Sequence, residues 1–174
     1  MLPTQTKVKK PKSAQQALSS LMRLCARAER SSGDAKRLMA TWGVAEGERA
    51  AVLQRLIKER FIDDERYAEA FVREKSRLNG WGEYKIRTAL GRKGISTDII
   101  EKALQQLSPE QNRERLTARL SRKIKTVKHS SPYDLKNKLL RYGLSLGFTM
   151  DDVIPCVEQL MRERKIEECD DFLY

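Results

Sequence analysis

The side chains that most often carry acid–base, nucleophilic or metal chemistry are few and scattered in this chain. There is one histidine, His129, and the three cysteines, Cys25, Cys156 and Cys169, form no CxxC pair. A catalytic triad, a zinc site and a disulfide framework each need more of these residues in closer association. The sequence also holds no GxxxxGKS/T phosphate loop and no GxGxxG turn. We predict a protein of a reducing compartment with no enzymatic activity, no cofactor and no metal.

One acidic triplet, Asp63-Asp64-Glu65, has the oxygen ligands that a hard metal ion prefers. It comes directly before an apolar helical face that begins with Tyr67. Carboxylates in the first turn of a helix bind its free N–H groups and complement its dipole. The triplet is therefore predicted to start a helix.

Cationic side chains at helical spacing are the chemistry that the sequence does offer. Lys and Arg number 35 against 24 Asp and Glu, so the net charge is +11. Two stripes each place three arginines on one helix face: Arg66, Arg73 and Arg77, and Arg115, Arg119 and Arg122. Like charges so aligned repel one another by roughly a few tenths of a kcal/mol per neighbouring pair. The stripes suggest an anionic partner, either nucleic acid or a carboxylate-rich protein surface; the alternative is an ordinary solvated helix face.

The charge is unevenly distributed along the chain. Residues 73–93 hold seven Lys or Arg and two Glu, and residues 113–141 hold ten Lys or Arg and two acidic residues. Residues 151–171 hold eight Asp or Glu and three Lys or Arg. We predict a positive surface that makes charge pairs and phosphate contacts and does not read bases. The predicted contact residues are Arg66, Arg73, Arg77, Lys85, Arg87, Arg92, Lys93, Arg115, Arg119, Arg122, Lys123, Lys136 and Lys138.

Helices must position these side chains. Apolar residues recur at helical spacing, and no segment shows the alternation of period two that a half-buried strand requires. Ser13, Ser108 and Ser131 are followed by Gln or Pro at positions that favour a helix start. We predict an all-α protein with nine helices, near residues 13–30, 33–42, 47–59, 64–78, 82–92, 97–107, 109–128, 132–146 and 150–165.

One pattern occurs three times: a helical stripe leads to a glycine, and a leucine follows thirteen residues later. The pairs are Gly43 with Leu56, Gly94 with Leu107, and Gly147 with Leu160. The glycines are 51 and 53 residues apart, which is typical of tandem helical repeats. Each glycine is predicted to end the second helix of its unit in the left-handed conformation. The predicted organisation is a flexible basic tail at 1–12, repeats at 13–62, 63–107 and 108–165, and an acidic tail at 166–174.

The middle repeat resembles a known family. Residues 61–72 read FIDDERYAEAFV and are similar to the signature segment of the RecX family, regulators of the RecA recombinase. The likeness continues through Trp81-Gly82, residues 85–87 and residues 93–96, and weaker matches extend it over about residues 14–162. Ala28, Asp34-Ala35 and Glu83 depart from the family pattern.

The resemblance implies three tandem three-helix repeats in an elongated, curved array. It also implies a partner, the RecA filament on single-stranded DNA, in whose groove the protein would bind. There it would inhibit ATP hydrolysis, strand exchange and co-protease activity. We further expect contact with the phosphates of the single-stranded DNA, a monomer, no membrane association and a cytoplasmic location.

Two other functions are compatible with the residues. A RecA-independent DNA-binding protein of helix-turn-helix-like units would show steeply salt-dependent affinity, because phosphate contacts release counterions. A helical-repeat scaffold for an unrelated protein would bind with little dependence on salt.

Overall fold

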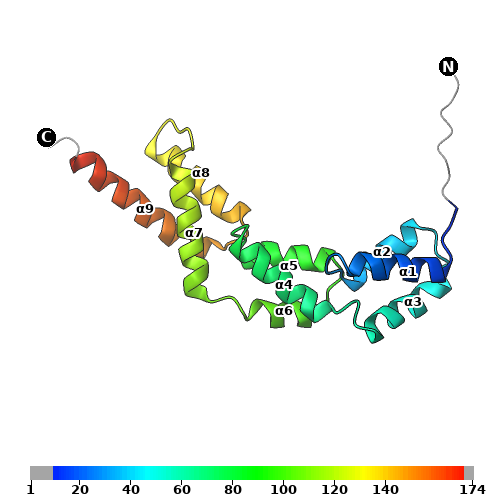
Figure 1. Cartoon of the computed structure of the whole chain (residues 1–174). Coiled ribbons are helices and arrows are strands. Elements are labelled where there is room, and N and C mark those ends of the chain that lie inside the picture. The colour runs from blue at the N-terminus through cyan, green and yellow to red at the C-terminus, as the bar shows by residue number, and fades with distance from the viewer. Residues whose placement is uncertain (1–9, 171–174) are drawn as a thin grey trace, which may run out of the picture. The chain divides into compact units, whose positions relative to one another are not determined.

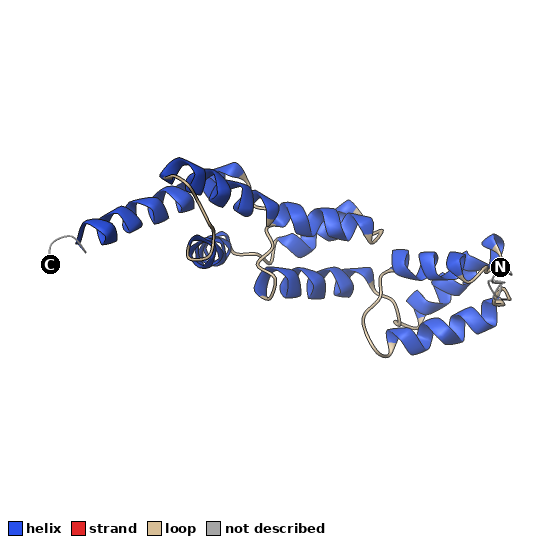
Figure 2. Ribbon diagram, turned by 90° about the horizontal axis from the view of Figure 1, so that it is seen from above, coloured by secondary structure: helices blue, strands red, loops and turns tan. Residues whose placement is uncertain are grey.

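The chain folds into helices joined by short loops. The computed structural model describes residues 10–170, with side chains through residue 164 (Figure 1). In this range there are nine helices: α1 (Ala14–Cys25), α2 (Ser32–Thr41), α3 (Glu46–Lys58), α4 (Asp64–Arg77), α5 (Glu83–Arg92), α6 (Thr97–Leu104), α7 (Pro109–Ile124), α8 (Pro132–Ser145) and α9 (Met150–Asp170). Figure 2 shows no strand among these residues. The predicted all-α class is confirmed.

Most helix starts follow from local capping chemistry. Ser13 and Gln16 form a complete capping box at α1. Ser108 and Ser131 accept a backbone N–H at the starts of α7 and α8, each with proline in the first helical turn. These three starts are as the sequence predicted.

The end of α1 differs from the prediction. The helix was expected to reach residue 30, but it ends at Cys25. The N–H groups of Arg27 and Ala28 both turn back to the carbonyl of Leu24, at 3.2 Å each. The chain must then reach the extended conformation of Ser31, the N-cap of α2, which leaves residues 26–30 to make the connection.

The three glycines of the repeated pattern have left-handed backbone conformations. Their φ angles are 71° for Gly43, 78° for Gly94 and 91° for Gly147. Each follows the last turn of a second helix, α2, α5 or α8. This confirms the predicted role of the three residues, because other residues rarely adopt such φ angles.

Two compact units make up the described residues, and each has its own core. The first comprises residues 10–68 and 91–99. Its core cluster joins α1, α2 and α3 through side chains such as Leu21, Met39 and Leu56, none of which is exposed.

The second unit comprises residues 69–90 and 100–170. Its core cluster joins α7, α8 and α9 through Leu116, Leu120, Leu139 and Val157, again with no exposed surface. The three predicted repeat borders are a division of the sequence and stay a prediction. Of the two predicted tails, residues 1–9 and 171–174 lie outside the described residues. The described part of the first includes Lys12, whose N–H binds the Trp42 carbonyl at 2.9 Å, and the described part of the second is the end of α9, which continues to Asp170.

No helix in the part of the chain that the structure describes has the length and apolarity needed to cross a membrane.

Candidate functional site

The first cationic stripe lies on α4. This helix starts at the acidic triplet, as the sequence predicted. Asp63 Oδ1 accepts the N–H of Arg66 at 3.0 Å and so caps the helix. Asp64 binds the start of α2: its carboxylate accepts the Ser32 N–H at 2.8 Å and the Ser32 hydroxyl at 2.5 Å. The buried face of α4 includes Tyr67 and Val72.

The three arginines of this stripe have different surroundings. Arg66 makes a bidentate ion pair with Glu29, at 2.8 and 3.1 Å. Arg73 and Arg77, one turn apart, are exposed. Within the described residues their guanidinium groups have no ion pair or hydrogen bond. The stripe therefore divides into one arginine with an internal partner and two that are open to an external one.

The cations of α5 divide in the same way. Arg87 makes two hydrogen bonds of 2.8 Å to Glu101, and this partner lowers the pKa of the Glu101 carboxyl. Lys93, just after the helix, binds Asp34 at 3.1 Å. Arg92 is exposed, and its guanidinium has no ion pair or hydrogen bond within the described residues, although its backbone carbonyl accepts a hydrogen bond from Arg37 at 2.7 Å.

Among the side chains that the structure describes, Asp34 is the one acidic residue that is buried. Its carboxylate accepts hydrogen bonds from Arg37 and from Lys93. Burial alone would raise the pKa of this carboxyl, but the two cations outweigh burial and lower it below its ordinary value. Lys93 thus takes part in an internal cluster of charges in the first unit.

A loop in the second unit gathers cations around an aromatic side chain. Trp81 packs edge-on against Phe71, with 6.4 Å between ring centroids. Lys85 Nζ lies 4.8 Å and Lys75 Nζ 5.7 Å from the centroid of the Trp81 ring, close enough for cation–π attraction. Lys85 Nζ also donates to the carbonyl of Ser145 at 3.0 Å. The Trp81 side chain therefore packs against Phe71 of α4 and contacts one lysine of α4 and one of α5.

Arg119 of α7 joins this loop from the other side. Its guanidinium donates to the carbonyl of Leu78 at 2.8 Å. It also lies against Gly80, where an added Cβ would be only 2.6 Å from Arg119 Nε. We call Lys75, Lys85 and Arg119 the loop cluster; the first two come from α4 and α5 and the third from α7.

The remaining predicted residues of α7 and α8 are mostly engaged. Arg115 donates to Gln111 at 2.9 Å, and Lys123 Nζ lies 5.3 Å from the Tyr142 ring centroid. Ion pairs join Lys136 to Glu158 at 3.1 Å and Lys138 to Asp134 at 2.8 Å. Arg122 is exposed and has no such partner within the described residues.

Four of the predicted contact residues are thus exposed and unpaired in the part of the chain that the structure describes: Arg73, Arg77, Arg92 and Arg122. Sequence reasoning missed the partners of the others, which are carboxylates for Arg66, Arg87, Lys93, Lys136 and Lys138. For Asp134 and Lys138 the i, i+4 spacing was a usable signal. For Glu29 with Arg66, 37 residues apart, no local signal exists.

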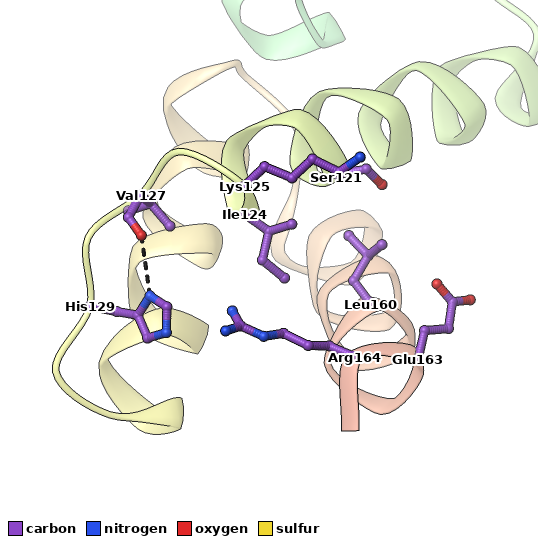
Figure 3. Close-up of a pocket in the computed structure, with 8 residues that line it drawn as sticks. All are labelled: Ser121, Ile124, Lys125, Val127, His129, Leu160, Glu163 and Arg164. Atoms are coloured by element: carbon purple, nitrogen blue, oxygen red, sulfur yellow. Dashed lines mark hydrogen bonds between the residues drawn. The ribbon is translucent and has the colours of Figure 1, made fainter. Parts of the chain in front are cut away.

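The only histidine lines a pocket of about 510 Å³ together with Ser121, Lys125, Leu160 and Glu163, among others (Figure 3). His129 Nδ1 lies 3.2 Å from the carbonyl of Val127. In a catalytic triad that nitrogen would be held by a carboxylate. Figure 3 shows the carboxylate of Glu163 directed away from the imidazole. The hydrogen bond holds the loop after α7 and does not orient a base.

The two cysteines with described side chains are packing residues. Cys156 is buried in the core of the second unit and lies 3.5 Å from the Thr117 hydroxyl. Burial raises the pKa of the Cys25 thiol, which keeps it protonated and unreactive near neutral pH.

Fold and site together define a class: an all-helical, strongly basic protein of small helical units, with exposed unpaired arginines on several helices. Comparison with known proteins shows what the chain is similar to. Residues 63–104 match the model of the second three-helix domain of RecX. In this segment the chain is similar to the RecX family.

The relatives cover different shares of the chain. It is 35% identical over 103 residues to the regulatory protein RecX of Clostridium botulinum, which is 58% of this chain and 48% of the relative. It is 30% identical over 123 residues to that of Bacillus cytotoxicus, 71% of this chain and 46% of the relative. The chain spans about half the length of the curated relatives it matches.

Solved structures agree in fold. The crystal structure of RecX from Lactobacillus salivarius superposes with a TM-score of 0.74 at 21% identity, covering 84% of this chain and 96% of that one. A second crystal structure of a regulatory protein RecX gives a TM-score of 0.76, also at 21% identity, over 86% of this chain and 73% of that one.

Proposed function

We propose that this chain binds the RecA filament on single-stranded DNA and inhibits RecA ATP hydrolysis, strand exchange and co-protease activity. The similarity to regulatory RecX proteins supports RecA as the partner. The net charge of +11 supports an anionic surface on that partner, formed by acidic side chains, DNA phosphates or both. The protein acts as a regulator from the cytoplasm and has no catalytic role of its own.

The observation that carries the proposal is the division of the cations. Within residues 63–104, the segment that matches the RecX model, Arg66, Arg87 and Lys93 are held by carboxylates. Arg73, Arg77 and Arg92 of the same segment are exposed and unpaired within the described residues.

An exposed arginine without a partner keeps its full hydrogen-bonding capacity for a carboxylate or a phosphate. We therefore assign the contact with RecA or DNA to Arg73, Arg77, Arg92 and Arg122. Most of the other predicted residues stabilise the fold of the chain itself through ion pairs or hydrogen bonds. They are Arg66, Arg87, Lys93, Arg115, Lys136 and Lys138. The loop cluster has the same role.

The test is the ATPase rate of RecA on single-stranded DNA while this protein is titrated below the RecA concentration. Strong inhibition at a small fraction of that concentration is expected, because a block to filament growth is amplified along the polymer. The triple variant Arg73→Glu, Arg77→Glu, Arg92→Glu should lose about tenfold or more in inhibitory potency, as charge pairs become repulsive.

The matched control reverses three exposed cations outside the predicted set: Arg27→Glu, Lys36→Glu and Arg162→Glu. It changes the net charge by the same amount and should keep near-normal inhibition. Equal losses in the two triple variants would reject the site assignment. Inhibition only at amounts that coat the DNA, with equal binding to DNA in the absence of RecA, would instead support the RecA-independent DNA-binding function.

A further inference from the structure

A pocket of about 490 Å³ lies in the second unit, where the starts of α5, α7 and α9 contribute to its wall. This volume is within the range of sites that bind small organic groups. Of the predicted contact residues only Arg87 lines the pocket, and Arg87 is held by Glu101. The proposed contacts with RecA and with DNA phosphates therefore leave this pocket without a role.

Close backbone contacts build one side of the pocket. The N–H of Tyr84 donates to the carbonyl of Gly147 at 3.2 Å, and an added Cβ on Gly82 would lie 2.4 Å from the same carbonyl oxygen. The start of α2 meets the end of α5 in the same way: an added Cβ on Gly33 would lie 2.0 Å from the Lys93 carbonyl oxygen. The contact with Gly147 fixes the backbone of Tyr84 at the wall of the pocket.

The Tyr84 side chain lines this pocket and is nevertheless 69% exposed. Within the described residues its ring makes no aromatic or cation–π contact, and its hydroxyl makes no hydrogen bond. Aromatic side chains that are open in this way are the platforms on which bases of single-stranded nucleic acids stack, since every base has a face for such a contact. Tyr84 thus offers an aromatic surface that the fold leaves open.

The charged groups of the wall favour a neutral base over a phosphate. Three carboxylates and two guanidinium groups line the pocket and give its wall a charge of −1: Glu83, Asp151, Asp152, Arg87 and Arg113. Glu83 and Asp151 have no hydrogen bond or ion pair within the described residues, so their oxygens are free to accept a donor. Arg113 is exposed, and its guanidinium also lacks such a partner in the described part of the chain.

We propose that this pocket receives one base of single-stranded DNA, stacked on Tyr84, with its exocyclic amine bound by Glu83 and Asp151 and a neighbouring phosphate bound by Arg113. The inference rests on the proposed contact with single-stranded DNA and adds base recognition, which the sequence did not predict. A carboxylate accepts a hydrogen bond from the N4 amine of cytosine, whereas thymine would present its O4 acceptor to the same oxygens. Cytosine is therefore preferred to thymine.

The first test needs no variant. Fluorescence anisotropy measures the binding of the unmodified chain to labelled oligo-dC and oligo-dT of equal length, about 12 nucleotides, without RecA. Both titrations are made at neutral pH and at one salt concentration, because phosphate contacts make the affinity salt-dependent. Oligo-dC is expected to bind about fivefold or more tightly than oligo-dT. Equal affinities would overturn the proposal.

A pair of tyrosine variants tests the stacking. Tyr84→Ala should weaken the binding of oligo-dC by about fivefold or more, and Tyr84→Phe should keep it, because the ring makes the contact. The matched control is Tyr133→Ala, which removes a tyrosine of α8 that is 76% exposed and does not line this pocket. Circular dichroism confirms that each variant is folded. Equal effects of Tyr84→Ala and Tyr133→Ala would reject the stacking contact.

The double variant Glu83→Gln, Asp151→Asn tests the base preference. Both oligonucleotides should bind more tightly, since two negative charges are removed, but the preference for oligo-dC should fall to about twofold or less, because amides also donate to thymine. An unchanged preference would contradict base recognition by the carboxylates.

Two further outcomes would overturn the proposal. One is displacement of oligo-dC by deoxycytidine monophosphate at similar concentrations, which would identify a free nucleotide as the ligand. The other is the absence of any binding to single-stranded DNA. Neither outcome decides the proposed function, which the RecA ATPase rate tests separately.

Discussion

At the scale of single residues, charge is used in two ways that the amino-acid types do not distinguish. Arg66 and Arg73 stand seven positions apart on one helix and both are exposed, yet the first is bound to Glu29 and the guanidinium of the second has no partner within the described residues. The difference depends on which carboxylate the fold brings near. Long-range partners of this kind make a residue structural even when it belongs to a conspicuous cationic stripe.

Asp34 gives the clearest prediction at this scale. Asp34→Asn should lower the free energy of unfolding by about 1–2 kcal/mol at neutral pH, because the bonds to Arg37 and Lys93 lose their charge. The folded carboxyl has a pKa below its ordinary value of 3.8. Its contribution is therefore fully present above that value and is lost as the pH falls through the lower folded pKa. Urea unfolding of both proteins at a series of pH values measures this.

The difference between the two proteins should shrink as the medium is acidified from about pH 5 to pH 3. A constant difference over this range would show that the ion pairs contribute nothing. The control is Asp151→Asn, which removes an exposed carboxylate that forms no ion pair within the described residues and should change the free energy of unfolding little.

The binding residues themselves were only partly predictable. Composition and helical spacing located the cations, because these are properties of the local sequence. They did not separate Arg92 from Lys93, which are adjacent. The two residues differ because Lys93 binds Asp34, which is 59 residues away in the sequence and is brought close by the fold of the first unit.

At the scale of helices, local chemistry decides the starts, and loops decide some of the ends. The serine caps and Asp63 are effective because a side-chain oxygen satisfies an N–H that no helical carbonyl can reach. The early end of α1 was missed because its cause lies in the next helix, whose cap needs extended backbone at Ser31. Helix C-termini have weaker sequence signals unless a glycine marks them.

One helix contains a residue that destabilises helical structure. Pro155 lies inside α9, beyond the first turn, and is exposed. Proline there removes the N–H that would bind the carbonyl of Asp151 and crowds that carbonyl. Pro155→Ala should raise the free energy of unfolding by about 1–3 kcal/mol. Thermal unfolding followed by circular dichroism provides the measurement.

Gln159→Ala, also on the exposed side of α9, is the control and should shift the midpoint only slightly. If Pro155→Ala gave no gain, the helix would already compensate for the missing bond. A loss of stability would mean that the proline ring makes a contact of its own.

At the scale of the whole molecule, the repeat pattern and the RecX signature led to the family, and the match to residues 63–104 supports it. The class of fold was predictable because apolar residues recur at helical spacing and capping residues mark several helix starts, such as Ser13, Ser108 and Ser131. The pairing of one second helix with the next was not. It depends on close backbone contacts at Gly33 and Gly82. The spacing of glycines in the sequence does not show whether a glycine is needed for such a contact or only for a turn of the chain.

The contact at Gly82 also limits which mutations this position can tolerate. Any single-base change in a glycine codon that replaces the residue introduces a Cβ, and here a Cβ would lie 2.4 Å from the Gly147 carbonyl oxygen. Gly91 has no atom within 4 Å of that position. Gly82→Ala should therefore destabilise the protein by about 2 kcal/mol or more, and Gly91→Ala should not. In a library of random mutants selected for soluble protein, we expect residue 82 to remain glycine almost without exception and residue 91 to be replaced freely.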